Sequence, residues 1–178
     1  MKLKLNYFLL FTVLSLNTIY AQDLYNLDRK FGFNKFKLES SFNLYEKQLR
    51  YLFSGSDKVK YYEYKGKDIP FIFGCFVKKI NLGFYKEKLY TISIIYITTG
   101  DKDEKNIQKG LQELFGYMPI EYNAETSDLK YDWVILWKTN KTHLQTGKIS
   151  CDNSYYACEV ETFLFSRKLR NEINNERF

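Results

Sequence analysis

The hydrophobic pattern changes its period within the central stretch 75–116. In the first part, Ile80, Leu82 and Phe84 alternate with polar or small residues, which is the period-two pattern of a strand with one buried face. A polar turn at 85–88 follows, and residues 89–97 are then almost continuously apolar and rich in β-branched side chains. Such a run is typical of a central strand that is covered on both sides. The stretch therefore begins with two strands joined by a tight turn.

The second part of the same stretch has the period of a helix. Asp101 or Asp103 can cap its start. One apolar stripe then recurs at intervals of three and four residues and comprises Ile107, Leu111, Leu114 and Phe115. Gly116 occupies the position of a left-handed C-cap, and Pro119 just beyond it prevents continuation. The pattern predicts a helix that folds back over the two strands.

The flanking segments carry the same two kinds of pattern. A helix is predicted over 41–53, capped by Ser40 or Ser41, with an apolar face made of Phe42, Tyr45, Leu49, Leu52 and Phe53. A strand is predicted at 58–64. Three more strands are predicted at 131–139, 144–151 and 157–165, followed by a short helix that Ser166 can cap.

The order of these elements predicts the fold class. The links between strands are short, which favours antiparallel pairing. We therefore expect an α+β fold, with an antiparallel sheet and helices packed on one face of it. Because a helix followed by strands occurs twice, two αβββ units in tandem are one arrangement that the order allows. Residues 22–178 are expected to form a single α+β domain.

The first residues have the pattern of an export signal. Lys2 and Lys4 precede an apolar run at 7–16, and Ala21 provides a small residue before Gln22. The run is shorter than the ~20 residues that a membrane-spanning helix needs. We predict a cleaved signal peptide at 1–21 and a mature chain that is exported, periplasmic or secreted, without a transmembrane segment.

Charge changes this picture little. The formal net charge is +6, and it falls to +4 if Lys2 and Lys4 are removed with the signal peptide. Both signs are interspersed, and no cluster of five or more basic residues occurs. This distribution favours solubility over a nucleic-acid partner.

Export makes disulfides permissible, so the cysteines become informative. Cys151 and Cys158 end two predicted strands and can face each other across a hairpin. We predict a disulfide between them, the alternative being two free and partly buried thiols. Cys75 lies between Phe73 and Phe76, and we interpret it as a buried small hydrophobe rather than a nucleophile or an intermolecular link.

Most catalytic groupings are missing from the sequence. His143 is the only histidine, which excludes multi-histidine zinc sites and the HExxH motif, and no metal or cofactor is expected. A Cys75–His143 couple is conceivable as nucleophile and base, but no local motif marks either residue. Glu159 and Glu161 share one face of a predicted strand, with carboxylates roughly 6–7 Å apart. They could serve a small exported hydrolase, or they could simply form a solvated strand face.

One resemblance supports a role in binding. The segments INLGFYKEKLYTISIIY and KGLQELFGYMP are similar to a pattern in small exported bacterial proteins of unknown function. The order of helix and strands also resembles that of β-lactamase inhibitory protein and of the small lipoprotein of the outer-membrane barrel assembly machinery, although the N-terminal cysteine of the lipoprotein is absent here. The resemblance in element order implies a binding module rather than an enzyme, and it transfers no site residues.

These observations predict a non-catalytic domain that binds an envelope or extracellular protein. The candidate contact residues are Tyr155 and Tyr156, at the tip of the predicted disulfide hairpin, where a rigid turn can present two large amphipathic rings. The alternative is the carboxylate hydrolase based on Glu159 and Glu161.

Overall fold

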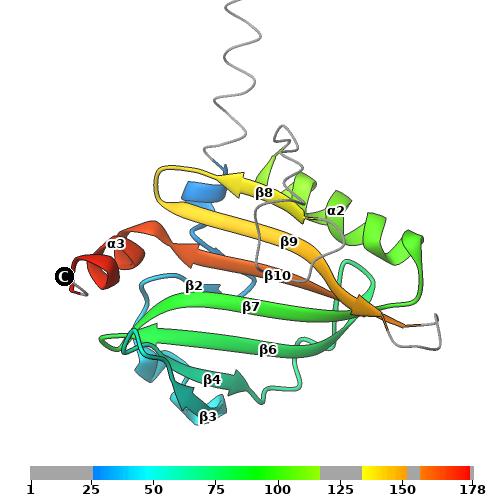
Figure 1. Cartoon of the computed structure of the whole chain (residues 1–178). Coiled ribbons are helices and arrows are strands. Elements are labelled where there is room, and N and C mark those ends of the chain that lie inside the picture. Colours follow the sequence, from blue (N-terminus) through cyan, green and yellow to red (C-terminus); the bar gives the residue numbers. More distant parts are fainter. Residues whose placement is uncertain (1–25, 117–133, 152–156, 177–178) are drawn as a thin grey trace, which may run out of the picture.

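The structure is a computed structural model that describes residues 26–116, 134–151 and 157–176. Eight of the described strands form one antiparallel sheet in the order β3-β4-β6-β7-β10-β9-β8, with β5 paired to β6 on the same side as β4 (Figure 1). The predicted α+β class and the antiparallel sheet are therefore confirmed. The last strands of the two halves of the chain, β7 and β10, lie side by side in the middle of the sheet.

The element bounds are as follows. The strands of the sheet are β3 (Leu49–Ser54), β4 (Lys60–Tyr64), β5 (Phe71–Ile72), β6 (Cys75–Tyr85), β7 (Lys88–Thr98), β8 (Val134–Lys138), β9 (Thr142–Cys151) and β10 (Cys158–Ser166). A small hairpin of β1 (Gly32–Phe33) and β2 (Phe36–Lys37) follows a helical turn at 26–30. Two 3-10 turns, η1 (Phe42–Leu44) and η2 (Glu46–Gln48), precede β3, and the two described α-helices with named bounds are α2 (Asp101–Phe115) and α3 (Arg167–Asn175).

The central hairpin forms as the hydrophobic pattern predicts. Strands β6 and β7 are joined by Lys86 and Glu87, which both have positive φ angles, 47° and 60°. Two successive residues with positive φ give a turn whose twist matches that of the flanking strands. Helix α2 follows, and Gly116, with a φ of 95°, ends it by donating its N–H to the carbonyl of Gln112.

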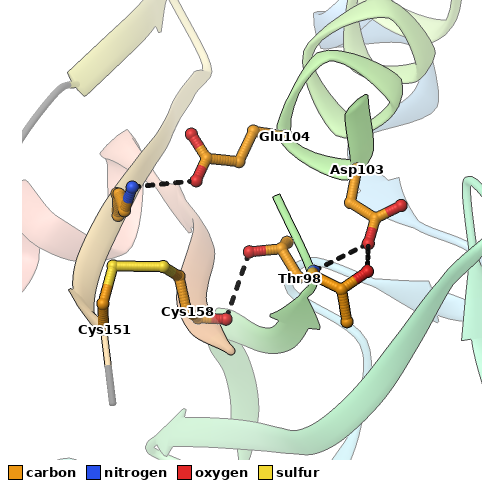
Figure 2. Close-up of a disulfide and its surroundings, with 7 residues drawn as sticks. Thr98, Asp103, Glu104, Cys151 and Cys158 are labelled. Atoms are coloured by element: carbon orange, nitrogen blue, oxygen red, sulfur yellow. Dashed lines mark hydrogen bonds and ion pairs between the residues drawn. A yellow bond between two sulfur atoms is a disulfide. The ribbon is translucent and has the colours of Figure 1, made fainter. Parts of the chain in front are cut away.

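The start of α2 is held by a side chain inside the helix rather than by a preceding cap. Gly100 is the N-cap residue, and Asp103 accepts hydrogen bonds from both the backbone N–H and the hydroxyl of Thr99, each at 2.8 Å (Figure 2). Negative charge in the first turn also complements the helix dipole.

The two helices contribute to different hydrophobic clusters. The apolar stripe of α2, with Ile107 and Leu111 at its centre, is buried in the main core, which also contains Phe84 of β6. Helix α3 packs through Leu169 and Ile173 in a second cluster, together with Tyr85, Tyr90 and Val59. Phe84 and its neighbour Tyr85 belong to different clusters, and adjacent strand residues point to opposite faces. The prediction that the helices share one face is therefore not confirmed, because α2 and α3 lie against opposite faces of the sheet.

The helix predicted over 41–53 is wrong. Residues 49–54 form β3, and only the two short 3-10 turns precede it. Apolar residues at helical spacing were misleading here because Tyr51 and Phe53 stack on aromatic residues of β4, and this cross-strand pairing overrides the local periodicity. Residues 31–100 thus contain no α-helix of the kind that a tandem αβββ arrangement would require, whereas α2 is followed by β8, β9 and β10.

The predicted cysteine pair lies at disulfide distance. Cys151 and Cys158 are directly opposite each other in the β9–β10 ladder, and their sulfur atoms are 2.18 Å apart (Figure 2). Beside this pair, the Thr98 hydroxyl donates to the Cys158 carbonyl at 3.2 Å. Glu104 of α2 forms a 3.1 Å ion pair with Lys148 of β9, so α2 is tied to the same corner of the sheet.

The predicted signal peptide 1–21 lies outside the described residues. Within the described ranges, no helix has the length and apolar character needed to cross a bilayer.

Candidate binding surface at the sheet edge

Large exposed hydrophobic side chains gather along one side of the sheet. In the described part of the chain these are Leu44, Tyr51, Phe53, Phe71 and Phe76. Leu44 lies at the end of η1, ahead of η2 and β3, two of the others lie on β3 itself, and the remaining two lie where β5 pairs with the start of β6. We call these five residues the hydrophobic edge. The register separates Phe71 and Phe76 from the β3 rings by roughly 20 Å along β6, so the hydrophobic edge consists of two exposed apolar groups. Exposed apolar side chains of this kind are a typical feature of contact sites.

Strand β3 presents an aromatic ring on each of its two faces. Tyr51 packs edge-on against Tyr62 with ring centroids 5.5 Å apart, and Phe53 stacks on Tyr61 at 4.8 Å. A bulge between Tyr51 and Phe53 separates the two contacts. Each exposed ring is backed by a partly buried one, so the two rings have defined positions although they are 55% exposed.

The outer side of β3 is also open along its backbone. Among the described strands, β4 is the only one that pairs with β3. An unpaired strand edge presents N–H and C=O groups that can bind an extended segment of another chain. The hydrophobic edge therefore combines main-chain hydrogen-bonding capacity with exposed rings.

The charges next to β3 compensate one another. Glu63 of β4 forms ion pairs with Lys65, at 2.9 Å, and with Arg50 of β3. The hydrogen bond from Lys65, with that from Arg50, lowers the pKa of the Glu63 carboxyl, although burial opposes this. Behind Phe53, burial together with the charge of Asp57 raises the pKa of Tyr61 to about 12, so that this ring is neutral at physiological pH. The charged groups beside β3 are therefore paired with one another, and the exposed rings of β3 lie next to compensated charge.

The other end of the hydrophobic edge is a second ring pair. Phe71 and Phe76 pack edge-on with centroids 5.8 Å apart. Between β5 and β6, Phe73 and Gly74 have positive φ angles of 54° and 77° and form a tight turn. A cavity of about 450 Å³ lies beside Phe71 and is lined mainly by Phe33, Ile72, Phe73, Leu114 and Phe115.

A polar cluster fixes the segment that leads into the edge. The Lys35 ammonium lies 2.7 Å from one carboxylate oxygen of Asp68, and the Tyr64 hydroxyl donates to the other at 2.6 Å. The hydrogen bond from Lys35, followed by that from Tyr64, lowers the pKa of Asp68 to about 2. For Lys35, burial opposes the charge, but the hydrogen bonds with Asp68 and Tyr64 outweigh it and raise the pKa. Asp68 and Lys35 thus stay charged at neutral pH, which suits an anchoring ion pair better than proton transfer.

The two candidate catalytic carboxylates have partners of their own. Glu159 and Glu161 point to the same face of β10, as predicted, because the alternate residues on this strand are buried. Glu159 forms an ion pair with Lys78, and Glu161 accepts a hydrogen bond from the hydroxyl of Ser93. The structure thus places both carboxylates in separate interactions.

Cys75 and His143 do not form a couple. The Cys75 thiol is buried against α2, where burial and the charge of Asp103 raise its pKa to about 11. His143 stacks on Phe165 at 4.5 Å, on the other face of the sheet. Phe76, the neighbour of Cys75, pairs with Ile97 of β7. Phe165, on which His143 stacks, pairs with Thr91 of β7. Along β7 these positions are about 20 Å apart.

The predicted contact residues Tyr155 and Tyr156 lie outside the described residues. The sequence pattern did not identify Tyr51 and Phe53 as exposed strand residues, because both fall within the helix predicted over 41–53, with Phe53 on its apolar face. No period-two pattern marks them, because the bulge between Tyr51 and Phe53 places the two rings on opposite faces of β3. Within the ranges that the structure describes, no group of three or more His, Cys, Asp or Glu side chains could hold a metal ion.

Comparison with known proteins gives no match, whether with family models, with curated sequences or with solved structures. The likeness to small exported bacterial proteins therefore stays a prediction, and the argument for function rests on the surface of the molecule.

Proposed function

We propose that this chain is a non-catalytic, exported binding domain that engages an envelope or extracellular protein through the hydrophobic edge. The observation that carries the proposal is that Tyr51 and Phe53, two of the five large exposed hydrophobic side chains of the described residues, lie on β3, whose outer edge pairs with no other described strand. A partner segment in extended conformation would pair with the backbone of β3 and cover Tyr51 and Phe53. Aromatic side chains are among those that contribute most to such interfaces.

Export is supported by two features of the chain. The pattern at 1–21 is that of a signal peptide. The Cys151–Cys158 pair at disulfide distance is of a kind that persists in oxidising compartments. An exported domain would meet its partner in the envelope or outside the cell.

The alternative, a carboxylate hydrolase, has no comparable support. A glycosidase-type pair requires one carboxyl group that is kept protonated and another that is free to attack or to activate water. Glu159 lies instead in an ion pair with Lys78. Glu161 is engaged by Ser93.

Site-specific photo-crosslinking tests the proposal. A benzophenone amino acid replaces Tyr51 or Phe53, and, as a control, Lys109 on the exposed side of α2. We expect one discrete cross-linked partner from an envelope extract with the two β3 positions and none with the α2 position. Equal labelling from all three positions, or none from β3, would contradict the edge as a binding site.

A second pair of variants separates the two candidate surfaces. If β3 is the contact, the Tyr51→Ala/Phe53→Ala variant loses the cross-linked partner in a pull-down, and Tyr155→Ala/Tyr156→Ala retains it. The reverse pattern would assign binding to the hairpin tip. Both variants should keep the wild-type circular dichroism spectrum, which shows that loss of binding is not loss of folding.

A further inference from the structure

A second cavity lies beside the turn that joins β8 and β9. These strands are at the end of the sheet opposite β3 (Figure 1). It has a volume of about 740 Å³ and lies between the 26–30 turn, β2, the β8–β9 turn and α3. Five basic residues line it, namely Arg29, Lys37, Lys141, Arg167 and Lys168. We call this cavity the basic cleft.

The carboxylates of the cleft do not neutralise these cations. Three acidic residues line it, and two of them have structural partners. Asp28 accepts hydrogen bonds from the Thr139 hydroxyl and from the Lys141 backbone N–H. Glu39 accepts from the Ser166 hydroxyl at 2.7 Å and lies 3.7 Å from Lys168. The five basic residues therefore outnumber the three acidic ones, and two of the three carboxylates hold the walls of the cleft together.

Two of the cations are left available. Neither Lys37 nor Lys141 forms an ion pair or a side-chain hydrogen bond with any residue that the structure describes. Both side chains are exposed, and they come from different chain segments on the rim of one cavity. The walls are fixed independently, because the Arg167 backbone N–H donates to the Lys141 carbonyl at 2.9 Å. Lys37 and Lys141 thus line one cavity and have no ion-pair partner among the described residues, although the Asp28 carboxylate lies beside the Lys141 backbone.

The start of α3 adds to the positive potential. This nine-residue helix begins at Arg167 and has no acidic residue in its first turn. The N-terminal end of a helix carries partial positive charge, which adds to that of Arg167 and Lys168, and the Glu39 carboxylate beside Ser166 and Lys168 offsets part of it. Amide side chains of Asn140 and Asn171 also line the cleft and can donate hydrogen bonds.

We propose that the basic cleft binds a phosphate-bearing ligand, with Lys37 and Lys141 contacting the anion. A volume of about 740 Å³ is larger than a single phosphate requires and fits a diphosphate or a phosphorylated small molecule. Lysine binds phosphate as a point charge, and Arg167, which lines the cleft and also donates to the Thr139 carbonyl, can add a planar donor. A soluble phosphate ester and the headgroup of a membrane phospholipid share this chemistry, and the tests below distinguish them.

Titration calorimetry with inorganic pyrophosphate at constant ionic strength tests the soluble form. The full mature chain is compared with Lys37→Gln/Lys141→Gln and with the matched pair Lys102→Gln/Lys105→Gln, which removes the same charge from exposed positions of α2. We expect saturable binding that the cleft pair weakens about tenfold or more, the loss of about 1.4 kcal/mol in binding free energy. The α2 pair should leave it unchanged.

Sedimentation with vesicles separates the two sources of phosphate. Binding to phosphatidylglycerol vesicles in a phosphatidylcholine background that needs Lys37 and Lys141, and that exceeds the affinity for glycerol phosphate, identifies a lipid headgroup. Tighter binding of the soluble ester identifies a free ligand. Equal weakening by the cleft pair and the α2 pair, or no saturable binding of either probe, overturns the proposal. The Tyr51→Ala/Phe53→Ala variant should bind pyrophosphate normally, so this test stands apart from the one on the hydrophobic edge.

Discussion

The two outer strands of the sheet, β3 and β8, are both rich in large apolar side chains, yet they are buried to very different extents. On β3, Tyr51 and Phe53 are each 55% exposed. On β8, Ile135 and Trp137 are 5% and 1% exposed. Both strands end the same antiparallel sheet among the described residues, so position at an edge does not explain the difference.

The difference lies in what packs against each strand. On β8, the Trp137 indole N–H donates to the carbonyl of Gly116 at the end of α2, at 3.0 Å. Just beyond the strand, the Thr139 hydroxyl bonds Asp28 of the 26–30 turn. On β3, the aromatic rings contact only their β4 neighbours on the inner side. Natural proteins usually protect such edges. An edge that keeps exposed rings is therefore more consistent with a binding role than with a structural one.

The largest expected effect on stability comes from removing a buried side chain of β8. Trp137→Ala removes a fully buried indole and leaves the Gly116 carbonyl without its donor. We expect the free energy of unfolding to fall by about 3–5 kcal/mol, the usual cost of an aromatic deletion in a core. Urea denaturation followed by circular dichroism measures it. A loss below about 1 kcal/mol would mean that the β8 edge is no better supported than β3.

The next effect tests the strand pair behind β8. Replacing Cys151 and Cys158 together with serine opens the cross-link between β9 and β10, whose cysteines are 7 residues apart. On the chain-entropy model, closing so short a loop contributes about 2.5 kcal/mol. We expect a loss of that size in urea, and no further loss when reductant is added to the double variant. If reductant leaves the wild-type midpoint unchanged, the two sulfurs are not linked in solution.

A smaller effect is the pH dependence of the free energy of unfolding, which tests the β8 side of the sheet alone. His143, on β9 opposite Lys138 of β8, is the only histidine. Burial, and then the charges of Lys138, Arg167 and Arg170, lower its pKa from 6.5 to about 4. Between these values the unfolded chain binds a proton that the folded chain does not, so stability falls as the pH falls from about 6.5 towards 4.

Urea midpoints between pH 7.5 and 5.5 measure this slope before the carboxylates titrate. It should stay below about 1 kcal/mol per pH unit, because solvent screens a ring that is only partly buried. His143→Gln should remove the slope, whatever it does to the absolute stability. A slope that persists in that variant would have to come from another group.

The same contrast explains which parts of the fold the sequence could predict. The β6–β7 hairpin, α2 and the β9–β10 pair follow from local periodicity, because one face of each element is buried and the apolar residues recur accordingly. Ser166 was a correct N-cap prediction, since its hydroxyl accepts from the Leu169 N–H at 3.3 Å. The cysteine pairing followed from spacing within a predicted hairpin.

The sequence failed where burial did not shape the pattern. Apolar residues of β3 are largely exposed, so their spacing carries no information on a buried face, and a helical stripe fits them by coincidence. Likewise, the basic cleft gathers residues from positions 29 to 168, and no local cluster of charge announces it. Such long-range sites depend on the sheet order, which a single sequence does not reveal.

The smallest effect on stability is expected at the hydrophobic edge itself. Phe53→Ala removes a ring that stacks on Tyr61 at 4.8 Å but remains 55% exposed. The lost stacking and partial burial should cost no more than about 1 kcal/mol in the free energy of unfolding. Measured beside Trp137→Ala under the same urea conditions, the two aromatic deletions should differ several-fold.

The stability of Phe53→Ala distinguishes a structural role of the β3 rings from a binding role. If Phe53→Ala costs 2 kcal/mol or more, the ring supports the fold, and its exposure needs no partner to explain it. If the cost is small while cross-linking from a benzophenone amino acid at position 51 is lost in the Phe53→Ala variant, the Phe53 side chain contributes to binding and not to folding. An exposed aromatic residue that serves a partner should be required for the contact and dispensable for stability.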